Sequence, residues 1–492
     1  MTGRIPAVLA IDVGTTSAKG GLVALDGRVV ASARRSYPIA VGDRPGWAEQ
    51  DPETWWNAVA SIGRELAGFD GAEVIAIAVD GHGPTLVAVD NDARPTRPAI
   101  TWLDTRATAE LDELSAATGL HGWALGVLPA ALWVERHDRD AAARSRWYLN
   151  TWEFLAFRLA GRAATALVAG QTPPSAEILR EAGLAASKIA PPVAAGQVVG
   201  GLTPAAAIAV GLPAGLPVVA GVVDAFASFH GAGLLAPGDA IDTGGMSGGF
   251  GVYWSDPVEA RGSFCTPAPL PGLHVVGGAM AATGRALDWF RDDVLGGAIT
   301  ADALIEEAGL VPPGADGLVF LPYLAGERSP IWDPLARGAF VGLTVRHGRG
   351  HMTRAILEAA ALAVRHVAEP ILAAGVTVRD VRVCGGPASS ATWNQIKADV
   401  TGFTVAVPHA LETAVVGSGI LGAVGVGAYG DLPSAIGAMT RIDGRIEPRP
   451  ELRARYDELF RIYKDLYPAL KTIVAPRAGA AEAQADAPVA VR

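Results

Sequence analysis

The chain has 492 residues, of which 50% are hydrophobic and 18% charged, and its formal net charge is −10. This length and composition predict about three folded domains, or two large ones. The negative charge argues against nucleic acid as a partner, because such a partner requires a basic face. Two cysteines in so long a chain argue against a disulfide framework and favour a cytoplasmic protein. The N-terminus lacks the apolar region of a signal peptide, and polar residues interrupt the apolar stretch near residues 217–236, so we expect no membrane span.

The first 90 residues carry the pattern of an α/β domain. Apolar runs predict strands at residues 7–12, 19–25, 28–33, 73–79 and 85–89. Asp26-Gly27 separates two of these runs, and this dipeptide is typical of a tight hairpin turn. Residues 52–66 begin with proline and acid, as helix N-termini do, and predict a helix.

The opening of the chain has an echo in its second half. AIDTGG at residues 240–245 repeats the apolar run, acid and small-residue turn of AIDVGT at residues 10–15. We interpret the echo as two duplicated α/β domains that face a cleft, although two unrelated glycine turns would give the same pattern. We expect domains at residues 1–236 and 237–472, the second ending in a helix near residues 456–470. We expect an irregular loop or cap at residues 165–195 and a disordered tail at residues 473–492.

Three turns are rich in glycine and hydroxyl residues, which is what a polyphosphate site needs. They are GTTS at residues 14–17 followed by Lys19, TGGMSGG at residues 243–249, and GGPASS at residues 385–390 between an apolar strand and a predicted helix. Asp12, beside the first turn, is placed to hold the waters of a nucleotide-bound magnesium. Each turn alone is equally typical of a hairpin or a strand-to-helix connection, so the hypothesis depends on their combination.

Asp224 follows the apolar run 217–223, which predicts a buried strand. A carboxylate at the carboxyl end of such a strand is where α/β proteins commonly place their chemistry. The alternative is that Asp224 caps the helix predicted to follow it, and the two roles are compatible.

Longer motifs in the chain resemble those of the FGGY carbohydrate kinases and, within them, the xylulokinase-like pentulose kinases. The resemblance spans roughly residues 8–467. The motifs that carry it are IDVGTTS (11–17), WAEQDP (47–52) with Trp55 and Trp56, GAFVGL (338–343), HM (351–352) with AILE (355–358), and GGPASSATWNQ (385–395) with Asp399.

The resemblance implies an α/β, actin/hexokinase-like (ribonuclease H-like) fold with two domains and the active site in the interdomain cleft. It implies in-line transfer of the γ-phosphoryl group of ATP, with Mg2+, and Asp224 as the general base. The implied sugar contacts are His82, Gly83, Trp102, Asp104 and Arg106. With the three turns above, the expected ATP contacts are Gly14, Thr15, Thr16, Ser17, Lys19, Thr243, Gly244, Gly245, Ser247, Gly284, Asp288, Gly385, Gly386 and Ser390. Asp12 and Asp224 are expected to hold magnesium through water.

The chain departs from the xylulokinase pattern at several positions. Ala225 replaces the usual asparagine after the catalytic aspartate, and Gly81 replaces the methionine of Met-His-Gly. We expect these two changes to open space in the sugar pocket and to alter its stereochemical preference. Ala130 replaces a lysine, and Met246 replaces a hydroxyl residue of the second phosphate turn. Residues 165–195 also lack the polar cap residues of xylulokinases.

These observations favour a ketopentose such as xylulose as substrate, with ribulose or a tetritol such as erythritol as alternatives. Glycerol is disfavoured, because the Arg-Glu pair of glycerol kinases would fall at Gly81 and His82. An actin-like ATPase and a catalytically silent regulatory protein are alternatives from a different class, which ATP turnover with and without a polyol would separate. The expected partners are a small sugar or polyol and ATP, with no nucleic acid and no membrane; a homodimer stays open.

Overall fold

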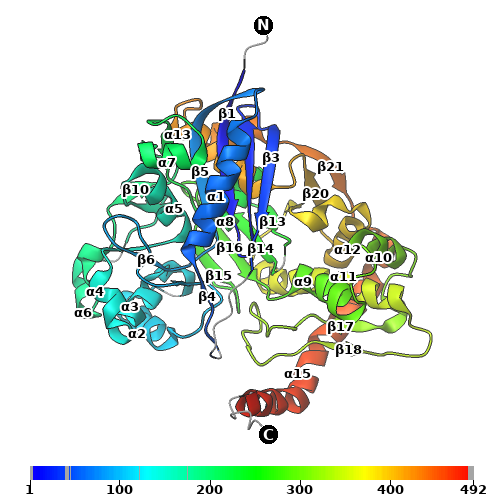
Figure 1. Ribbon diagram of the computed structural model, residues 1–492. Coiled ribbons are helices and arrows are strands. Elements are labelled where there is room, and N and C mark those ends of the chain that lie inside the picture. The colour runs from blue at the N-terminus through cyan, green and yellow to red at the C-terminus, as the bar shows by residue number, and fades with distance from the viewer. Residues whose placement is uncertain are drawn as a thin grey trace. The chain divides into compact units, whose positions relative to one another are not determined.

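The computed structural model describes residues 4–38, 44, 46–120, 122–173, 175–245 and 247–485, with side chains up to residue 473. The chain divides into two units (Figure 1). Unit 1 comprises the described residues up to Leu235 together with Pro267–Gly272 and Glu412–Thr440. Unit 2 comprises Ala236–Thr266, Leu273–Leu411 and the described residues from Arg441 onward.

Unit 1 is built on a six-stranded mixed sheet in the order β11-β12-β5-β1-β2-β3. The strands are β1 (Ile5–Val13), β2 (Ser17–Ala24), β3 (Val29–Ser36), β5 (Ala72–Gly81), β11 (Val198–Gly201) and β12 (Pro217–Val219). The first three form antiparallel hairpins, the second of which turns at Asp26-Gly27 as its sequence predicts. β1 and β5 are parallel, as are β5 and β12, so their carboxyl ends share one edge of the sheet.

Helices cover both faces of this sheet. Leu9 and Ile11 of β1 share a core with Trp55 of α1 (Pro52–Ala67), whereas Val8, one residue away, meets Gly422 of α13 (Thr413–Gly425). Because side chains alternate along a strand, α1 and α13 lie on opposite faces. The other helices of unit 1 are α2 (Thr108–Thr118), α3 (Leu128–His137), α4 (Arg139–Arg144), α5 (Thr151–Ala160), α6 (Ala176–Glu181), α7 (Pro204–Val210), α8 (Asp224–Gly231) and α14 (Leu432–Met439).

Unit 2 repeats the same arrangement with a seven-stranded sheet in the order β15-β16-β14-β13-β19-β20-β21. Its strands are β13 (Asp239–Asp242), β14 (Gly249–Trp254), β15 (Phe264–Pro267), β16 (His274–Ala279), β19 (Asp380–Val383), β20 (Val405–Pro408) and β21 (Ile442–Ile446). β13 pairs antiparallel with β14 and parallel with β19, as β1 pairs with β2 and β5. The echo in the sequence is therefore a duplicated α/β fold, which confirms the expected fold class.

The α-helices of unit 2 include two long ones, α11 (Arg349–Ala373) and α15 (Arg453–Ala485). The shorter ones are α9 (Thr283–Trp289), α10 (Ala301–Gly309) and α12 (Ala391–Thr401). Short two-stranded sheets complete the chain: β4 (Glu49–Gln50) with β7 (Ala99–Ile100), β6 (Val87–Val89) with β8 (Trp147–Leu149), β9 (Thr165–Leu167) with β10 (Pro192–Ala194), and β17 (Val319–Leu321) with β18 (Ala339–Val341). Among the described residues, no helix has both the length and the apolarity needed to cross a bilayer.

Three expectations about organisation need correction. The second domain is not one continuous segment, because Glu412–Thr440 belongs to unit 1, where glycines of α13 let it approach α8 and β1 closely. Residues 165–195 are not merely a loop, since they contain β9, α6 and β10. The tail expected to be disordered is helical as far as Ala485, consistent with the high helix propensity of alanine, and residues 486–492 lie outside the described part.

Candidate functional site

Three carboxylates meet at the carboxyl edge of the unit 1 sheet. Asp12 near the end of β1 and Asp80 near the end of β5 are direct neighbours in the parallel ladder. Gly81 forms a bridge with Val223, so Asp224, the next residue, starts α8 beside the same edge. Asp80 is fully buried, whereas Asp12 and Asp224 are partly exposed. The buried strand expected before Asp224 is shorter than predicted, because β12 ends at Val219.

Burial and mutual repulsion raise the pKa values of these carboxylates. Burial raises the pKa of Asp224 to about 7, and the charge of Asp12 adds to the rise. A hydrogen bond from the Ala225 N–H to Asp224 Oδ1, at 2.7 Å, opposes it. Burial and the Asp12 charge also raise the pKa of Asp80 well above its usual value. A carboxylate with a pKa near neutrality, and with access to solvent, is suited to accept a proton from a hydroxyl group.

Two side chains from other parts of unit 1 hold the carboxylate cluster. Ser418 of α13 is fully buried and donates a hydrogen bond from Oγ to Asp80 Oδ2. Lys19 is the partner of Asp12 across the β1–β2 ladder, and its charge lowers the pKa of Asp12 against the larger effect of burial. Lys19 Nζ forms an ion pair with Glu412 Oε2 at 2.5 Å, so this cation is already paired.

The first predicted phosphate turn is held by side chains that bind its carbonyl groups. Tyr37 Oη donates to the Gly14 carbonyl at 2.7 Å, and Gln50 Nε2 donates to the Thr15 carbonyl at 3.3 Å. The Gly14 N–H closes the turn on the Ser17 carbonyl at 3.0 Å. The turn is therefore held in one shape next to Asp12, and Thr15 and Thr16 are partly exposed.

His82 lies two residues beyond Asp80 and is buried. Burial lowers its pKa to about 3, so the imidazole is neutral at physiological pH. The Thr85 hydroxyl accepts a hydrogen bond from the Trp102 N–H at 3.2 Å and lies 3.0 Å from His82 Nδ1. His82 Nδ1 is thus engaged by Thr85, whereas Nε2 has no hydrogen-bond partner in the described part of the chain. The Trp102 indole donates to Thr15 Oγ1 at 3.1 Å and joins His82 to the first turn.

The absence of a side chain at Gly81 does not open the pocket. A Cβ atom at Gly81 would lie 2.9 Å from Thr151 Cγ2, and one at Gly83 would lie 2.8 Å from Trp152 Cζ3. The start of α5 fills the space that the missing methionine was expected to leave. The expectation was wrong for Gly81, because the Met-His-Gly comparison could not show which helix packs against this turn.

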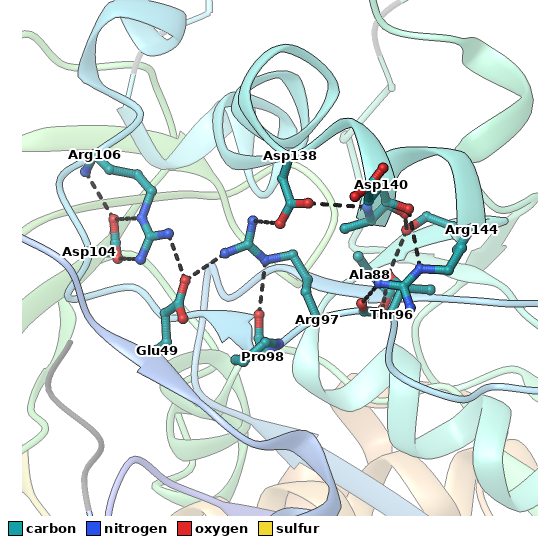
Figure 2. A network of polar contacts seen from close by, with 12 residues as sticks. Glu49, Ala88, Thr96, Arg97, Pro98, Asp104, Arg106, Asp138, Asp140 and Arg144 are labelled. Atoms are coloured by element: carbon teal, nitrogen blue, oxygen red, sulfur yellow. Dashed lines mark hydrogen bonds and ion pairs between the residues drawn. The ribbon is translucent and has the colours of Figure 1, made fainter. Parts of the chain in front are cut away.

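Asp104 and Arg106 bind each other (Figure 2). Arg106 Nε and Nη2 donate to the two oxygens of Asp104 at 2.9 and 2.6 Å, and both side chains are almost completely buried. Arg106 Nη1 also donates to Glu49 Oε1 at 2.6 Å, and its guanidinium lies 3.5 Å from the centre of the Trp47 ring. Arg97 extends this network from the other side of Glu49. Both oxygens of the Asp104 carboxylate therefore accept hydrogen bonds from the protein itself, and a sugar hydroxyl could bind Asp104 only by replacing one of them.

In unit 2, the loop that follows β13 is tied to the start of α9. The Gly284 N–H donates to the Gly245 carbonyl at 3.1 Å, and the Thr283 N–H and Oγ1 donate to the Ser247 carbonyl at 3.3 and 3.0 Å. The Thr243 N–H donates to the Gly249 carbonyl at 2.9 Å and closes the loop at its base. Met246, one of the departures from the xylulokinase pattern, lies outside the described residues.

The third turn has the predicted strand–glycine–helix form. Gly385 follows β19 with a φ of 71°, and Ser390 Oγ caps α12 by accepting from the Trp393 N–H at 3.2 Å. The space against Gly245 and Gly386 is open, since a Cβ atom at either position would meet no atom within 4 Å. Asp288 is half-exposed on α9 and forms an ion pair with Arg291 at 3.1 Å.

Each unit, taken by itself, presents groups of the kind that bind a nucleotide or its magnesium. A cavity of about 10 Å³ is lined by Gly244, Gly245, Thr283, Gly284 and Pro387, so the second and third turns and the start of α9 converge at one place. In unit 1, Asp12 Oδ1 is buried without a partner among the described residues. Among the described residues, no group of three or more His, Cys, Asp or Glu side chains is arranged as a set of metal ligands.

Sequence reasoning missed the residues that surround these sites. Asp80 is the partner of Asp12 in the parallel β1–β5 ladder. The strand predicted at residues 73–79 ends one residue short of Asp80, and a strand longer by that residue would have placed Asp80 beside Asp12. Ser418 and Lys397 gave no local signal, because each acts on a carboxylate far away in the sequence.

Comparisons with known proteins identify the family to which this sequence is similar. The sequence profile of the FGGY family of carbohydrate kinases, N-terminal domain, matches residues 7–231, and that of the C-terminal domain matches residues 242–426. The chain is 28% identical to the xylulose kinase of Bacillus subtilis, covering 95% of this chain and 97% of the relative. It is 31% identical to the xylulose kinase of Escherichia coli, over 80% of this chain and 84% of that relative. A gluconokinase of Bacillus subtilis is 29% identical, covering 93% and 95%.

Solved structures show the same fold. The xylulose kinase from Rhodospirillum rubrum is 32% identical with a TM-score of 0.78, covering 95% of this chain and 99% of that one. The ligand-bound xylulose kinase from Lactobacillus acidophilus superposes with a TM-score of 0.84 at 24% identity, covering 96% and 99%.

Proposed function

Because the chain belongs to the FGGY family of carbohydrate kinases, we propose that it transfers the γ-phosphoryl group of ATP to a hydroxyl of a ketopentose such as xylulose. The observation that carries this proposal is Asp224, a partly exposed carboxylate with a pKa of about 7 at the carboxyl edge of a parallel strand pair. Ribulose and erythritol stay as alternative substrates of the same reaction.

Asp224 accepts the proton of the attacking hydroxyl as its oxygen bonds to the γ-phosphorus and the bond to ADP breaks. His82 is neutral and so offers its Nε2 as a hydrogen-bonding group to the sugar rather than acting as an acid. The turns at Gly245 and Gly386, where the backbone faces open space, offer backbone amides to the nucleotide. Magnesium bound with ATP would neutralise phosphate charge, and Asp12 with Asp224 would hold its waters.

The charge around the carboxylate cluster favours a neutral sugar over an aldonate such as gluconate. A sugar acid would bring its own carboxylate towards Asp12 and Asp224, and like charges repel. Lys19 is paired with Glu412, and Arg106 is paired with Asp104 and Glu49, so neither cation is free to bind a carboxylate. The gluconokinase relative makes gluconate the comparison that matters most.

The test is ADP release with xylulose, ribulose, erythritol, glycerol, gluconate and a hexose, with the phosphorylated product identified by mass spectrometry. The expected result is that a ketopentose gives the highest kcat/KM and that ATP turnover without sugar is far slower. Preference for gluconate or a hexose would contradict the substrate assignment. ATP turnover that no sugar accelerates would contradict the kinase assignment and favour an ATPase or a silent protein.

A further inference from the structure

The duplicated fold places an aspartate at the same point of each unit, but the two aspartates have different surroundings. Asp12 ends the apolar run before the first turn, and Asp242 ends β13 before the second. Asp12 Oδ1 has no hydrogen-bond partner among the described residues. Asp242 Oδ2 instead receives the ammonium group of Lys397 at 2.6 Å. The two copies of the motif therefore differ in their direct partners: Asp242 is paired with a lysine, whereas Asp12 lies beside Asp80.

The Asp242–Lys397 pair is buried beneath the second turn. Each residue exposes only 5% of its surface. Asp242 Oδ1 accepts the Gly244 N–H at 3.1 Å, so the same carboxylate also fixes the first residues of the turn. Lys397 reaches it from α12, the helix that follows the third turn.

Two small cavities lie on either side of the Asp242–Lys397 pair. One, of about 10 Å³, is lined by the pair together with Gly244, Gly245, Thr283 and Gly284, which belong to the expected nucleotide site. The other, also about 10 Å³, is lined by the pair and by apolar side chains such as Val381, Val383 and Phe403. The pair thus lies between the phosphate-binding turn and the apolar core of unit 2.

We propose that Lys397 is a positioning residue of the nucleotide site that cancels the charge of Asp242, so that the turn at residues 243–249 can accept a polyphosphate. This inference rests on the proposed function, because it assumes that ATP binds at this turn. An unpaired carboxylate at this depth would repel the phosphates. At an effective dielectric constant of about 20, one charge within about 10 Å of another changes affinity on the order of 10-fold.

The two members of the pair should act in opposite directions on nucleotide binding. Lys397→Met keeps the length of the side chain and removes its charge, so ATP should bind about 10-fold more weakly. Asp242→Asn keeps an oxygen for the Gly244 N–H and leaves the lysine charge in place, so ATP should bind at least as tightly as to the unchanged protein. The double variant Asp242→Asn/Lys397→Met is neutral again and should recover most of the affinity that Lys397→Met loses.

The experiment is calorimetric titration of the full-length chain and of each variant with AMP, ADP and ATP. Electrostatic repulsion predicts that the loss caused by Lys397→Met grows with phosphate charge from AMP to ATP, whereas a general loosening of unit 2 would weaken all three alike. The KM for the sugar should stay unchanged. If Lys397→Met does not fold, the comparison of Asp242→Asn with the double variant carries the test, and tighter ATP binding by Asp242→Asn is expected.

Equal weakening by Lys397→Met and Asp242→Asn, or an equal loss for AMP and ATP, would overturn the inference. Normal ATP affinity in folded Lys397→Met would overturn it as well, while the proposed function stood. Failure of the unchanged protein to bind ATP would instead overturn the proposed function, and the inference with it.

Discussion

Glu153 offers a prediction whose size can be worked out from the structure. It lies near the start of α5, almost fully buried, and its oxygens accept hydrogen bonds from the backbone N–H groups of Asn150 and Ala166, each at 2.8 Å. Burial nevertheless raises its pKa from 4.5 to about 7, against the effect of these hydrogen bonds. The perturbation is Glu153→Gln, which has nearly the same shape and no charge.

A raised pKa means that the folded chain holds the Glu153 proton more tightly than the unfolded chain does. The contribution of Glu153 to the free energy of unfolding is therefore greatest below about pH 4.5 and falls as the pH rises through 7. With about 1.4 kcal/mol for each pKa unit, the loss is about 3 kcal/mol by pH 8, as an upper value. Glu153→Gln has no proton to lose. Its stability relative to the unchanged chain should improve by about 2.5 kcal/mol between pH 5 and pH 8, whatever constant penalty the amide brings.

The assay is thermal unfolding of both proteins at pH 5, 6, 7 and 8, with hydrogen exchange of the α5 amides to locate the effect. For a unit of this size, about 2.5 kcal/mol corresponds to a relative shift in Tm of about 5–10 °C. A difference in Tm that stays constant with pH would refute the reasoning. It would mean that the two backbone N–H groups stabilise the carboxylate as much as burial destabilises it.

Three further substitutions test other parts of unit 1. Gly81→Ala should lower stability by about 1–3 kcal/mol, because its Cβ would lie 2.9 Å from Thr151 Cγ2, and thermal unfolding that is unchanged would contradict this packing. Arg106→Ala should cost about 3–5 kcal/mol by leaving the Asp104 carboxylate buried without its partner; urea unfolding measures this, and a near-neutral result would remove the network from the account. Asp12→Asn should weaken the magnesium dependence of activity. It should also move the acidic limb of the pH–rate profile to lower pH, because the Asp12 charge raises the pKa of Asp224, the proposed base. An unmoved acidic limb together with an unaltered magnesium response would contradict both proposed roles of Asp12.

The sequence predicts the individual helices, strands and turns of this protein better than it predicts which of them pack together. The Asp26-Gly27 hairpin, the helix that begins at Pro52 and the strand–glycine–helix unit around Gly385 all depend on local chemistry, and the structure contains each of them. The repeated AID segment also indicated the duplication, because it marks the central strand of each sheet.

Features that depend on distant packing could not be predicted in this way. Nothing near Gly81 indicates that Thr151 of α5 fills the space beside it. Nothing near Asp80 indicates the hydroxyl of Ser418, because α13 joins unit 1 from a segment more than 300 residues later in the chain. The residues that tune the candidate site are therefore found only once the helices are in place.

The central claim is that Asp224 is the base of a sugar kinase, and the most direct test is product formation by Asp224→Asn. This change keeps an oxygen that can accept the Ala225 N–H and removes the ability to take up a proton. Calorimetric titration should still show ATP binding by the variant. The rate at which phosphorylated sugar appears, followed by phosphorus NMR, should fall by about 10²–10⁴-fold, which is the usual contribution of a general base. A folded Asp224→Asn protein that phosphorylates the sugar at a near-normal rate would contradict the account.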